Sequence, residues 1–205
     1  MAASPSLIPV SMDVTSRASV ARASERLAGV VGHLDGVVCA AGVFAGGPLV
    51  EIAEEKVQNA LDVNVMGAFC VVREFYPPLS AARGRIILIS SESTRSVMPF
   101  TGPYSMSKST LEAYADSLQR EISSLGIRVS VIQPGAFRTT LLARAREALN
   151  RGTAASPFSA PLDRAREMLG RESEKGMAPD RVARLVIHAL ECARPRPCSP
   201  CFPRR

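Results

Sequence analysis

The sequence shows neither a long apolar run nor the pattern of a signal peptide. No uninterrupted apolar stretch approaches the roughly 20 residues that a membrane-spanning helix needs, and no basic segment followed by an apolar one opens the chain, as a signal peptide would require. The five cysteines are an odd number, which is typical of a reducing compartment and not of a disulfide framework. We therefore expect a cytoplasmic protein without a membrane span.

Metal-ligand spacing and a basic patch are also missing. Cys198 and Cys201 form a single C-x-x-C motif, and neither His33 nor His188 has the sequence spacing of a zinc ligand. A structural zinc site needs about four ligands, so we expect none here. The net charge is +6, but the arginines are scattered among acidic residues and are not interleaved with aromatics. We therefore expect no nucleic-acid partner.

Lysine is scarce, which draws attention to one pair of residues. Only three of the 25 basic residues are lysines, and the others are arginines. Tyr104 and Lys108 are four residues apart, which places them one turn apart on one face of a helix. A compact ammonium beside a phenol favours the phenolate, lowers its pKa from about 10 and cannot be replaced by a guanidinium without loss. The pair is either an acid/base device or an exposed Tyr and Lys on a surface helix.

The apolar pattern alternates between strand-like and helix-like segments. Residues 85–90 are apolar and β-branched and lead into Ser91, which places this hydroxyl at the carboxyl end of a strand, where ligand sites form in open α/β sheets. We expect strands at 7–12, 35–40, 85–90 and 127–132, helices at 17–31, 53–75, 103–125, 138–150 and 179–193, a loop at 42–52, and a loose segment at 151–177 with one short helix. This order predicts an α/β fold with a parallel sheet.

The length of 205 residues and a hydrophobic content of 46% suffice for one core. We expect a single domain over residues 1–193, followed by a Pro/Arg-rich tail at 194–205 that is disordered.

Six short motifs, in order along the chain, resemble those of the short-chain dehydrogenase/reductase family. They are Asp13-Val14-Thr15, Cys39-Ala40-Ala41-Gly42, Asn64, Ser91, Tyr104 with Lys108, and Pro134-Gly135 with Thr139. The resemblance implies a Rossmann-like doubly wound parallel sheet and NAD or NADP as cofactor. The stretch from Pro103 to Thr139 is most similar to the steroid and retinol dehydrogenase branch.

The resemblance also implies a role for each residue. Tyr104 is expected to exchange a proton with the substrate oxygen, Ser91 to hydrogen-bond that oxygen, and Lys108 to lower the Tyr104 pKa and hold the nicotinamide ribose. Asn64 is expected to anchor a water through a backbone distortion in its helix. The implied cofactor-binding residues are Asp13, Val14, Ala40, Ala41, Gly42, Tyr104, Lys108, Pro134, Gly135, Phe137 and Thr139. Each motif taken singly also has a purely structural interpretation. Ser91 can be a cap at the end of a strand, Asn64 an ordinary polar residue of a helix, and Pro134-Gly135 a turn.

The expected activity is an NAD(P)-dependent interconversion of a secondary alcohol and a ketone or aldehyde. Residues 140–178 correspond to the variable substrate loop of the family, and their apolar side chains suit a small apolar substrate of steroid, retinoid or lipid type. In the family, the helices at 53–75 and 103–125 form a dimer bundle, so a homodimer through them is expected.

One family motif is absent from these residues. The glycine-rich turn T-G-x-x-x-G-x-G, which receives the cofactor pyrophosphate, matches neither the glycines at 29–32 nor those at 42–47. Residues 7–12 resemble the third strand of the family, so the first two strands and the first helix are lacking and the strand at 35–40 is expected to be an open edge. A natural short isoform, a start codon placed too late and a pseudogene-like product all fit, and we favour the late start. The alternative function is a catalytically deficient fragment that acts through association.

Overall fold

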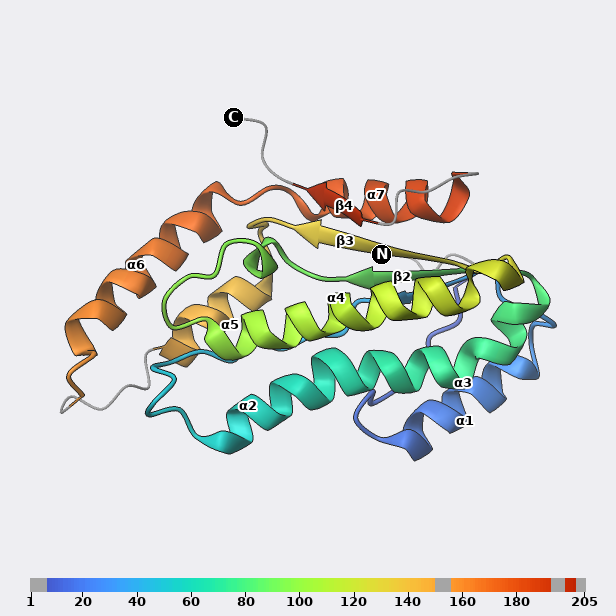
Figure 1. Ribbon diagram of the computed structural model, residues 1–205, viewed down its shortest axis with the longest axis horizontal. Coiled ribbons are helices and arrows are strands. Elements are labelled where there is room, and N and C mark those ends of the chain that lie inside the picture. Colours follow the sequence, from blue (N-terminus) through green and yellow to red (C-terminus); the bar gives the residue numbers. More distant parts are fainter. Residues whose placement is uncertain (1–6, 150–155, 193–197, 202–205) are drawn as a thin grey trace.

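The protein folds around a four-stranded parallel sheet with helices on both faces. The computed structural model describes residues 7–149, 156–192 and 198–201. Its strands are β1 (Gly36–Cys39), β2 (Arg85–Ile89), β3 (Arg128–Pro134) and β4 (Cys198–Cys201), and they lie in the order β1-β2-β3-β4. Figure 1 shows α3 (Gly67–Ala81) and α4 (Gly102–Ile122) on one side of the sheet and α7 (Pro179–Glu191) on the other. The predicted α/β fold is confirmed.

The side chains of β2 show how this layering is built. Ile86 and Leu88 are fully buried in the cluster formed with α3 and α4, whereas Ile87 between them is buried against Val182 of α7. A strand covered on both faces has no polar face, which is why its sequence is a continuous apolar run.

The predicted strand at 7–12 is wrong. This segment has no regular secondary structure, and Val10, Met12 and Val14 instead pack their side chains on the cluster of Val20 and Phe75. A strand is stable only where a neighbour accepts its backbone hydrogen bonds, and in the described part of the chain β1 pairs with β2 alone. β1 is therefore an edge strand, as expected.

The chain end also differs from the prediction. Residues 194–205 were expected to be disordered, but Cys198–Cys201 form β4, which pairs in parallel with β3 from Val131 to Pro134. The pairing supplies hydrogen-bond partners to a β3 edge that would otherwise be open, and a proline is tolerated in β4 because this strand lies at the edge of the sheet. The rest of the predicted tail lies outside the described residues.

Two further helices are α1 (Arg17–Ala28), which precedes β1, and α2 (Glu54–Leu61), which follows it. α2 continues through a π-helical turn at Asp62–Met66 into α3. The predicted helix at 53–75 is thus present, although it extends to Ala81. After α4, a short 3₁₀ turn leads to Gly126, whose positive φ of 83° ends the helical segment.

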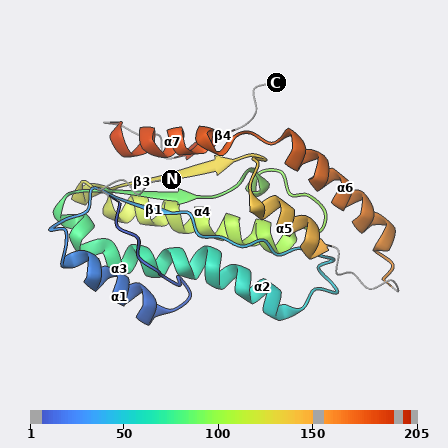
Figure 2. The same ribbon diagram turned by 180° about the vertical axis from the view of Figure 1, so that it is seen from behind.

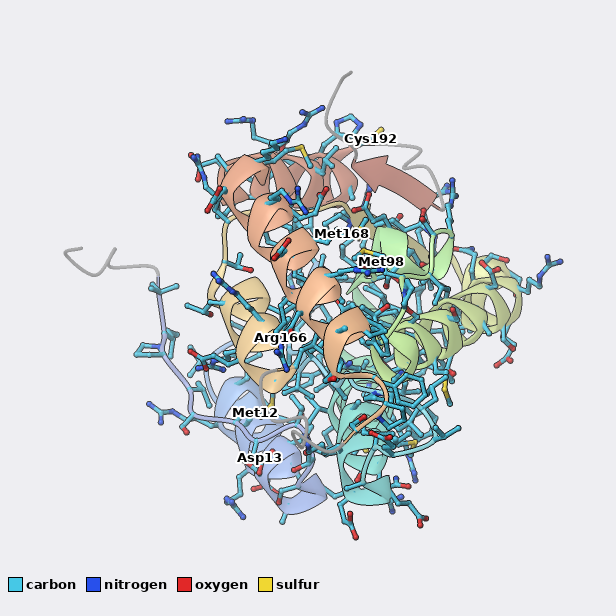
Figure 3. The ribbon with its side chains drawn as sticks, turned by 90° about the vertical axis from the view of Figure 1, so that its left-hand side faces the viewer. Met12, Asp13, Met98, Arg166, Met168 and Cys192 are labelled. Atoms are coloured by element: carbon cyan, nitrogen blue, oxygen red, sulfur yellow. The ribbon has the colours of Figure 1, made fainter. Side chains whose placement is uncertain are left out.

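Two further helices, α5 (Thr140–Leu149) and α6 (Ser159–Lys175), lie beyond the carboxyl ends of the strands (Figures 1 and 2). They pack on each other around Leu149, Leu162 and Leu169, with Met98 and Phe100 against them. Figure 3 looks from the α6 side and shows Met98 beside this helix, whereas Asp13 lies apart from it, near α1. The short helix predicted within 151–177 is therefore a helix of 17 residues.

Candidate active site

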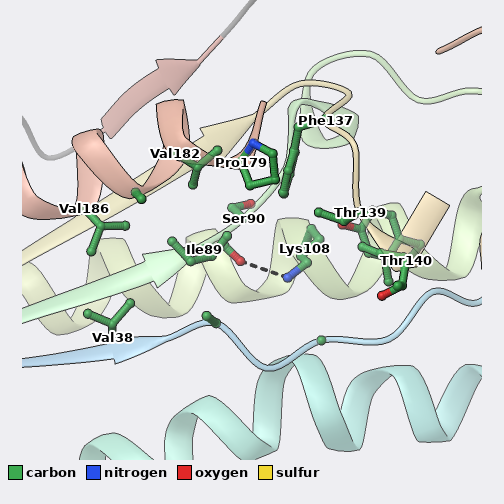
Figure 4. Close-up of a pocket in the computed structure, with 15 residues that line it drawn as sticks. Val38, Ile89, Ser90, Lys108, Phe137, Thr139, Thr140, Pro179, Val182 and Val186 are labelled. Atoms are coloured by element: carbon green, nitrogen blue, oxygen red, sulfur yellow. Dashed lines mark hydrogen bonds between the residues drawn. The ribbon is translucent and has the colours of Figure 1, made fainter. Parts of the chain in front are cut away.

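Tyr104 and Lys108 lie together at the carboxyl ends of β1 and β2. The helix α4 has Pro103 in its first turn, where a missing N–H costs no hydrogen bond. Both side chains are buried, with 9% of Tyr104 and 4% of Lys108 exposed, so the alternative of an exposed pair is wrong. The Lys108 Nζ donates to the Ile89 carbonyl at 2.9 Å (Figure 4) and lies 5.8 Å from the centroid of the Tyr104 ring.

A pocket of about 380 Å³ lies beside these side chains, within the size range of small-ligand sites. Six of the predicted cofactor-binding residues line it: Ala40, Gly42, Tyr104, Lys108, Phe137 and Thr139. The lining residues that were not predicted are Val38, Ile89, Ser90, Thr140, Leu141, Pro179, Val182, Ala183 and Val186. Val182 and Val186 form an i,i+4 apolar pair on α7, but such a pattern predicts a buried helix face without saying what lies opposite (Figure 4).

Burial controls the protonation of the pair. It raises the pKa of Tyr104, and a hydrogen bond with Ser91 opposes this rise. Burial also lowers the pKa of Lys108 to about 8, against the charge of Glu112, which raises it. The net shift of the Tyr104 pKa is thus upward, opposite to the lowering predicted for the pair, because desolvation of the phenolate is its largest cause.

Ser91 both caps a short helical turn and hydrogen-bonds the Tyr104 side chain. It caps the 3₁₀ turn at Glu92–Thr94, where its Oγ accepts from the Ser93 backbone N–H at 3.2 Å. The same hydroxyl also hydrogen-bonds the Tyr104 side chain. A hydroxyl has one donor and two acceptor positions, so the cap leaves Ser91 able to interact with an oxygen beside Tyr104.

Asn64 sits inside the π-helical turn, and 1% of it is exposed. Its Oδ1 accepts from the Val43 N–H at 2.8 Å, and its Nδ2 donates to the Val43 carbonyl at 2.9 Å and to Ser107 Oγ at 2.8 Å. Both amide hydrogens are therefore committed. A water at Asn64 would have to donate to Oδ1 or to a main-chain carbonyl that the widened turn leaves free.

The other predicted residues are spread out. Ala41 is exposed beside the pocket, and Pro134 and Gly135 are buried at the end of β3 without lining it. Val14 packs at Gly67, where an added Cβ would lie 2.7 Å from its Cγ2. The exposed carboxylate of Asp13 accepts from the backbone N–H and the hydroxyl of Thr15, and these bonds lower the pKa of Asp13.

A nicotinamide cofactor fits this pocket at one end. A Cβ added to Gly42 would lie 3.3 Å from Asn64 Oδ1 and 3.5 Å from Lys108 Nζ, so a side chain at this position would fill the space beside two polar atoms that suit a ribose. The apolar walls suit an aromatic ring. The 205 residues contain no glycine-rich turn for the pyrophosphate, so the fit covers the nicotinamide and its ribose.

Within residues 7–149, 156–192 and 198–201, no helix is both long enough and apolar enough to cross a membrane. The same ranges contain no group of three or more His, Cys, Asp or Glu residues that could hold a metal ion.

Known proteins resemble this chain over most of its length. Residues 1–150 match the family described as short chain dehydrogenase. Retinol dehydrogenase 7 of Mus musculus is 39% identical over 134 residues, which are 64% of this chain and 42% of that protein. The 17-beta-hydroxysteroid dehydrogenase type 6 of Homo sapiens is 39% identical over 133 residues, which are 63% of this chain and 42% of that protein. The chain thus spans about two fifths of the length of these relatives.

A solved structure of a short chain dehydrogenase/reductase is also similar to this chain. The short chain dehydrogenase/reductase from Burkholderia phymatum, determined in complex with NAD, superposes with a TM-score of 0.80 at 25% identity and covers 94% of this chain and 70% of that chain. The names of the two relatives, a retinol dehydrogenase and a hydroxysteroid dehydrogenase, confirm the steroid and retinol dehydrogenase branch predicted from residues 103–139. On the match over residues 1–150, the chain belongs to the short-chain dehydrogenase family.

Proposed function

We propose that this chain carries the catalytic half of an NAD(P)-dependent oxidoreductase that interconverts a secondary alcohol and a ketone or aldehyde. The observation that carries the proposal is the hydrogen bond between the Tyr104 and Ser91 side chains, next to a pocket that Tyr104 and the buried Lys108 line and that suits a nicotinamide and its ribose. When bound, the cofactor supplies or accepts the hydride.

The chain's own residues would handle the proton. A phenol with a raised pKa is protonated at neutral pH, so Tyr104 is set to give its proton to the oxygen of a carbonyl as charge develops there. The Ser91 hydroxyl would donate a hydrogen bond to the same oxygen. In the reverse direction Tyr104 must first lose its proton, so alcohol oxidation is expected to need a higher pH than carbonyl reduction.

Cofactor binding would use the residues around the pocket. Lys108 and the backbone at Gly42 are placed to bind the ribose, with Ala40, Ala41, Phe137 and Thr139 beside the nicotinamide. We assign Pro134 and Gly135 to shaping the turn after β3. Asp13 and Val14, just before α1, would contact the adenosine end. The cofactor is NAD or NADP.

The substrate would be apolar. Leu141 lines the pocket, and α5 and α6 place a second apolar cluster, with Phe44 and Phe158 at its border, beyond the strand ends. The names of the relatives, retinol dehydrogenase and 17-beta-hydroxysteroid dehydrogenase, agree with a steroid, retinoid or lipid-like alcohol or ketone.

A homodimer would bury the outer face of the long helices. Met66 at the end of the π-helical turn and Met106 in α4 are 43% and 49% exposed, which is costly for side chains that gain free energy on leaving water. A dimer through α2–α3 and α4 would cover both. Light scattering of the purified chain tests this directly, since a monomer at all concentrations contradicts it.

A deficient fragment is the second candidate, and the missing glycine-rich turn with the open edge of β1 favours it. The two candidates differ in one assay. The chain is incubated with retinol or a hydroxysteroid and either cofactor up to several millimolar, and NAD(P)H formation is followed. A catalytic chain gives a rate that rises linearly with cofactor and falls about 10²–10⁴-fold in Tyr104→Phe. Equal rates in both proteins, or none in either, would reject the catalytic proposal.

A further inference from the structure

A polar cluster of two buried and two half-buried side chains lies beside the pocket, between α4 and the ends of β2 and β3. Ser90 Oγ and Gln133 Nε2 both donate to Glu112 Oε1, the latter at 2.8 Å, and Gln133 Nε2 also lies 3.3 Å from Thr94 Oγ1. Ser90 and Gln133 are 3% and 1% exposed. One carboxylate oxygen of α4 thus gathers donors from the ends of two neighbouring strands, so the cluster holds the helix in register with the sheet.

Glu112 also continues the series of Tyr104 and Lys108. The three residues follow at four-residue steps on α4, so Glu112 lies one turn beyond the ammonium. Its charge favours the charged form of Lys108 and opposes the effect of burial. The carboxylate therefore limits the fall of the Lys108 pKa, although burial has the larger effect.

The other groups around Lys108 do not supply such a charge. Tyr104, on the same helix, is neutral at physiological pH because burial raises its pKa. β2 presents the Ile89 carbonyl to Nζ, as Figure 4 shows, and the segment after β1 presents the backbone at Gly42. Within the described part of the chain, Glu112 is the carboxyl group whose charge acts on Lys108.

We infer that Glu112 is a positioning residue of the site: its carboxylate fixes Ser90 at the end of β2, and with it the adjacent Ser91, and it keeps Lys108 charged beneath Tyr104. The inference deepens the proposed function and rests on it for its catalytic meaning. A purely structural Glu112 would hold α4 to the strands without affecting the protonation of Lys108, and this difference decides the test.

The test uses the small number of lysines. The chain has three lysines, so protein labelled with ¹³C at lysine Cε gives three NMR signals, and Lys108→Arg identifies the one from Lys108. In wild type this signal should titrate with a pKa of about 8. In Glu112→Gln, which keeps the hydrogen-bond acceptor but removes the charge, the midpoint should fall by about one pH unit. Glu112→Asp, which retains the charge, should restore a midpoint close to that of wild type.

Glu121 offers a matched control. It lies on the same helix and accepts from the Ser117 hydroxyl at 2.9 Å on the exposed face, so Glu121→Gln should leave the Lys108 midpoint unchanged. The same midpoint in wild type and Glu112→Gln, or an equal shift in Glu121→Gln, would overturn the inference.

A second variant covers the case in which Glu112→Gln does not fold. Glu112→Met also removes the charge and replaces it with an apolar side chain of similar length, so the Lys108 midpoint should fall as it does in Glu112→Gln. The wild-type midpoint in Glu112→Met would reject the inference. Neither titration needs cofactor or turnover, so a failure of the proposed function leaves both results interpretable.

Discussion

Replacing Asn64 by alanine should destabilise the protein strongly, whatever its catalytic role. Its amide makes three hydrogen bonds of 2.8, 2.9 and 2.8 Å, two to the Val43 backbone and one to Ser107 Oγ, and the side chain is almost fully buried. A hydrogen bond contributes about 1 kcal/mol net, and an unpaired buried partner costs more. Since Ser107 keeps its bond to the Tyr104 carbonyl, we expect a loss of about 3 kcal/mol in the free energy of unfolding for Asn64→Ala.

Urea denaturation measures this loss as a lower midpoint at unchanged m-value. Asn59 is the matched control, because it is an exposed asparagine in α2, just before the same π-helical turn, and Asn59→Ala should change the stability by less than about 0.5 kcal/mol. Asn64→Asp adds a second comparison: its carboxylate carries no hydrogens for the Val43 carbonyl and Ser107, so the variant should be no more stable than Asn64→Ala. A loss below about 1 kcal/mol in Asn64→Ala, or an equal loss in Asn59→Ala, would refute the reasoning.

Three further outcomes are expected. Lys108→Arg should lower turnover and change the pH–rate profile, because a planar guanidinium does not fit a point-charge position buried against the Ile89 carbonyl, and superimposable profiles would contradict this. Lys108 has a folded pKa of about 8, below the unfolded value of 10.5, so it binds fewer protons in the folded state between these values. Wild type should therefore gain up to about 2 kcal/mol of stability relative to Lys108→Met as the pH rises from 8 to about 9.5, and lose it again as the pH falls, which urea titrations at several pH values can measure. Isothermal titration of the 205-residue chain with NADH and NADPH should give dissociation constants above about a millimolar, because the sequence has no glycine-rich turn for the pyrophosphate, and micromolar binding would show that another segment replaces it.

Local pattern was sufficient for the central elements and for the pairing of two site residues. The apolar run at 85–90, the proline at 103 and the glycine at 126 predicted β2 and the ends of the helical segment that follows, since each acts within a few residues of itself. The four-residue step from Tyr104 to Lys108 is likewise a property of the helix alone.

Errors arose where the outcome depends on distant partners. Residues 7–12 have the composition of a strand but no neighbour to pair with, and Cys198–Cys201 form a strand because the edge of β3 is free, although their own sequence is atypical of one. In α6, Pro161 and Gly170 resemble helix breakers, yet Pro161 lies in the first turn and packing on α5 supports the rest. The direction of the Tyr104 pKa depends on how deeply the fold buries the ring, which spacing does not reveal.

The π-helical turn at Asp62–Met66 also sets the rotational phase of everything that follows it. A π turn contains about one residue more than an α-helical turn, so it rotates the next helix by about 100° relative to an uninterrupted one. Ala68, Val72 and Leu79 meet the sheet only with this rotation. If the turn became α-helical with all its residues kept, the apolar stripe of α3 would turn away from β2 and toward water, whereas the deletion of a single residue from the turn would restore a plain α-helix and leave the stripe on the sheet. The number of residues in this turn, and not only their identity, is therefore part of what the sequence encodes.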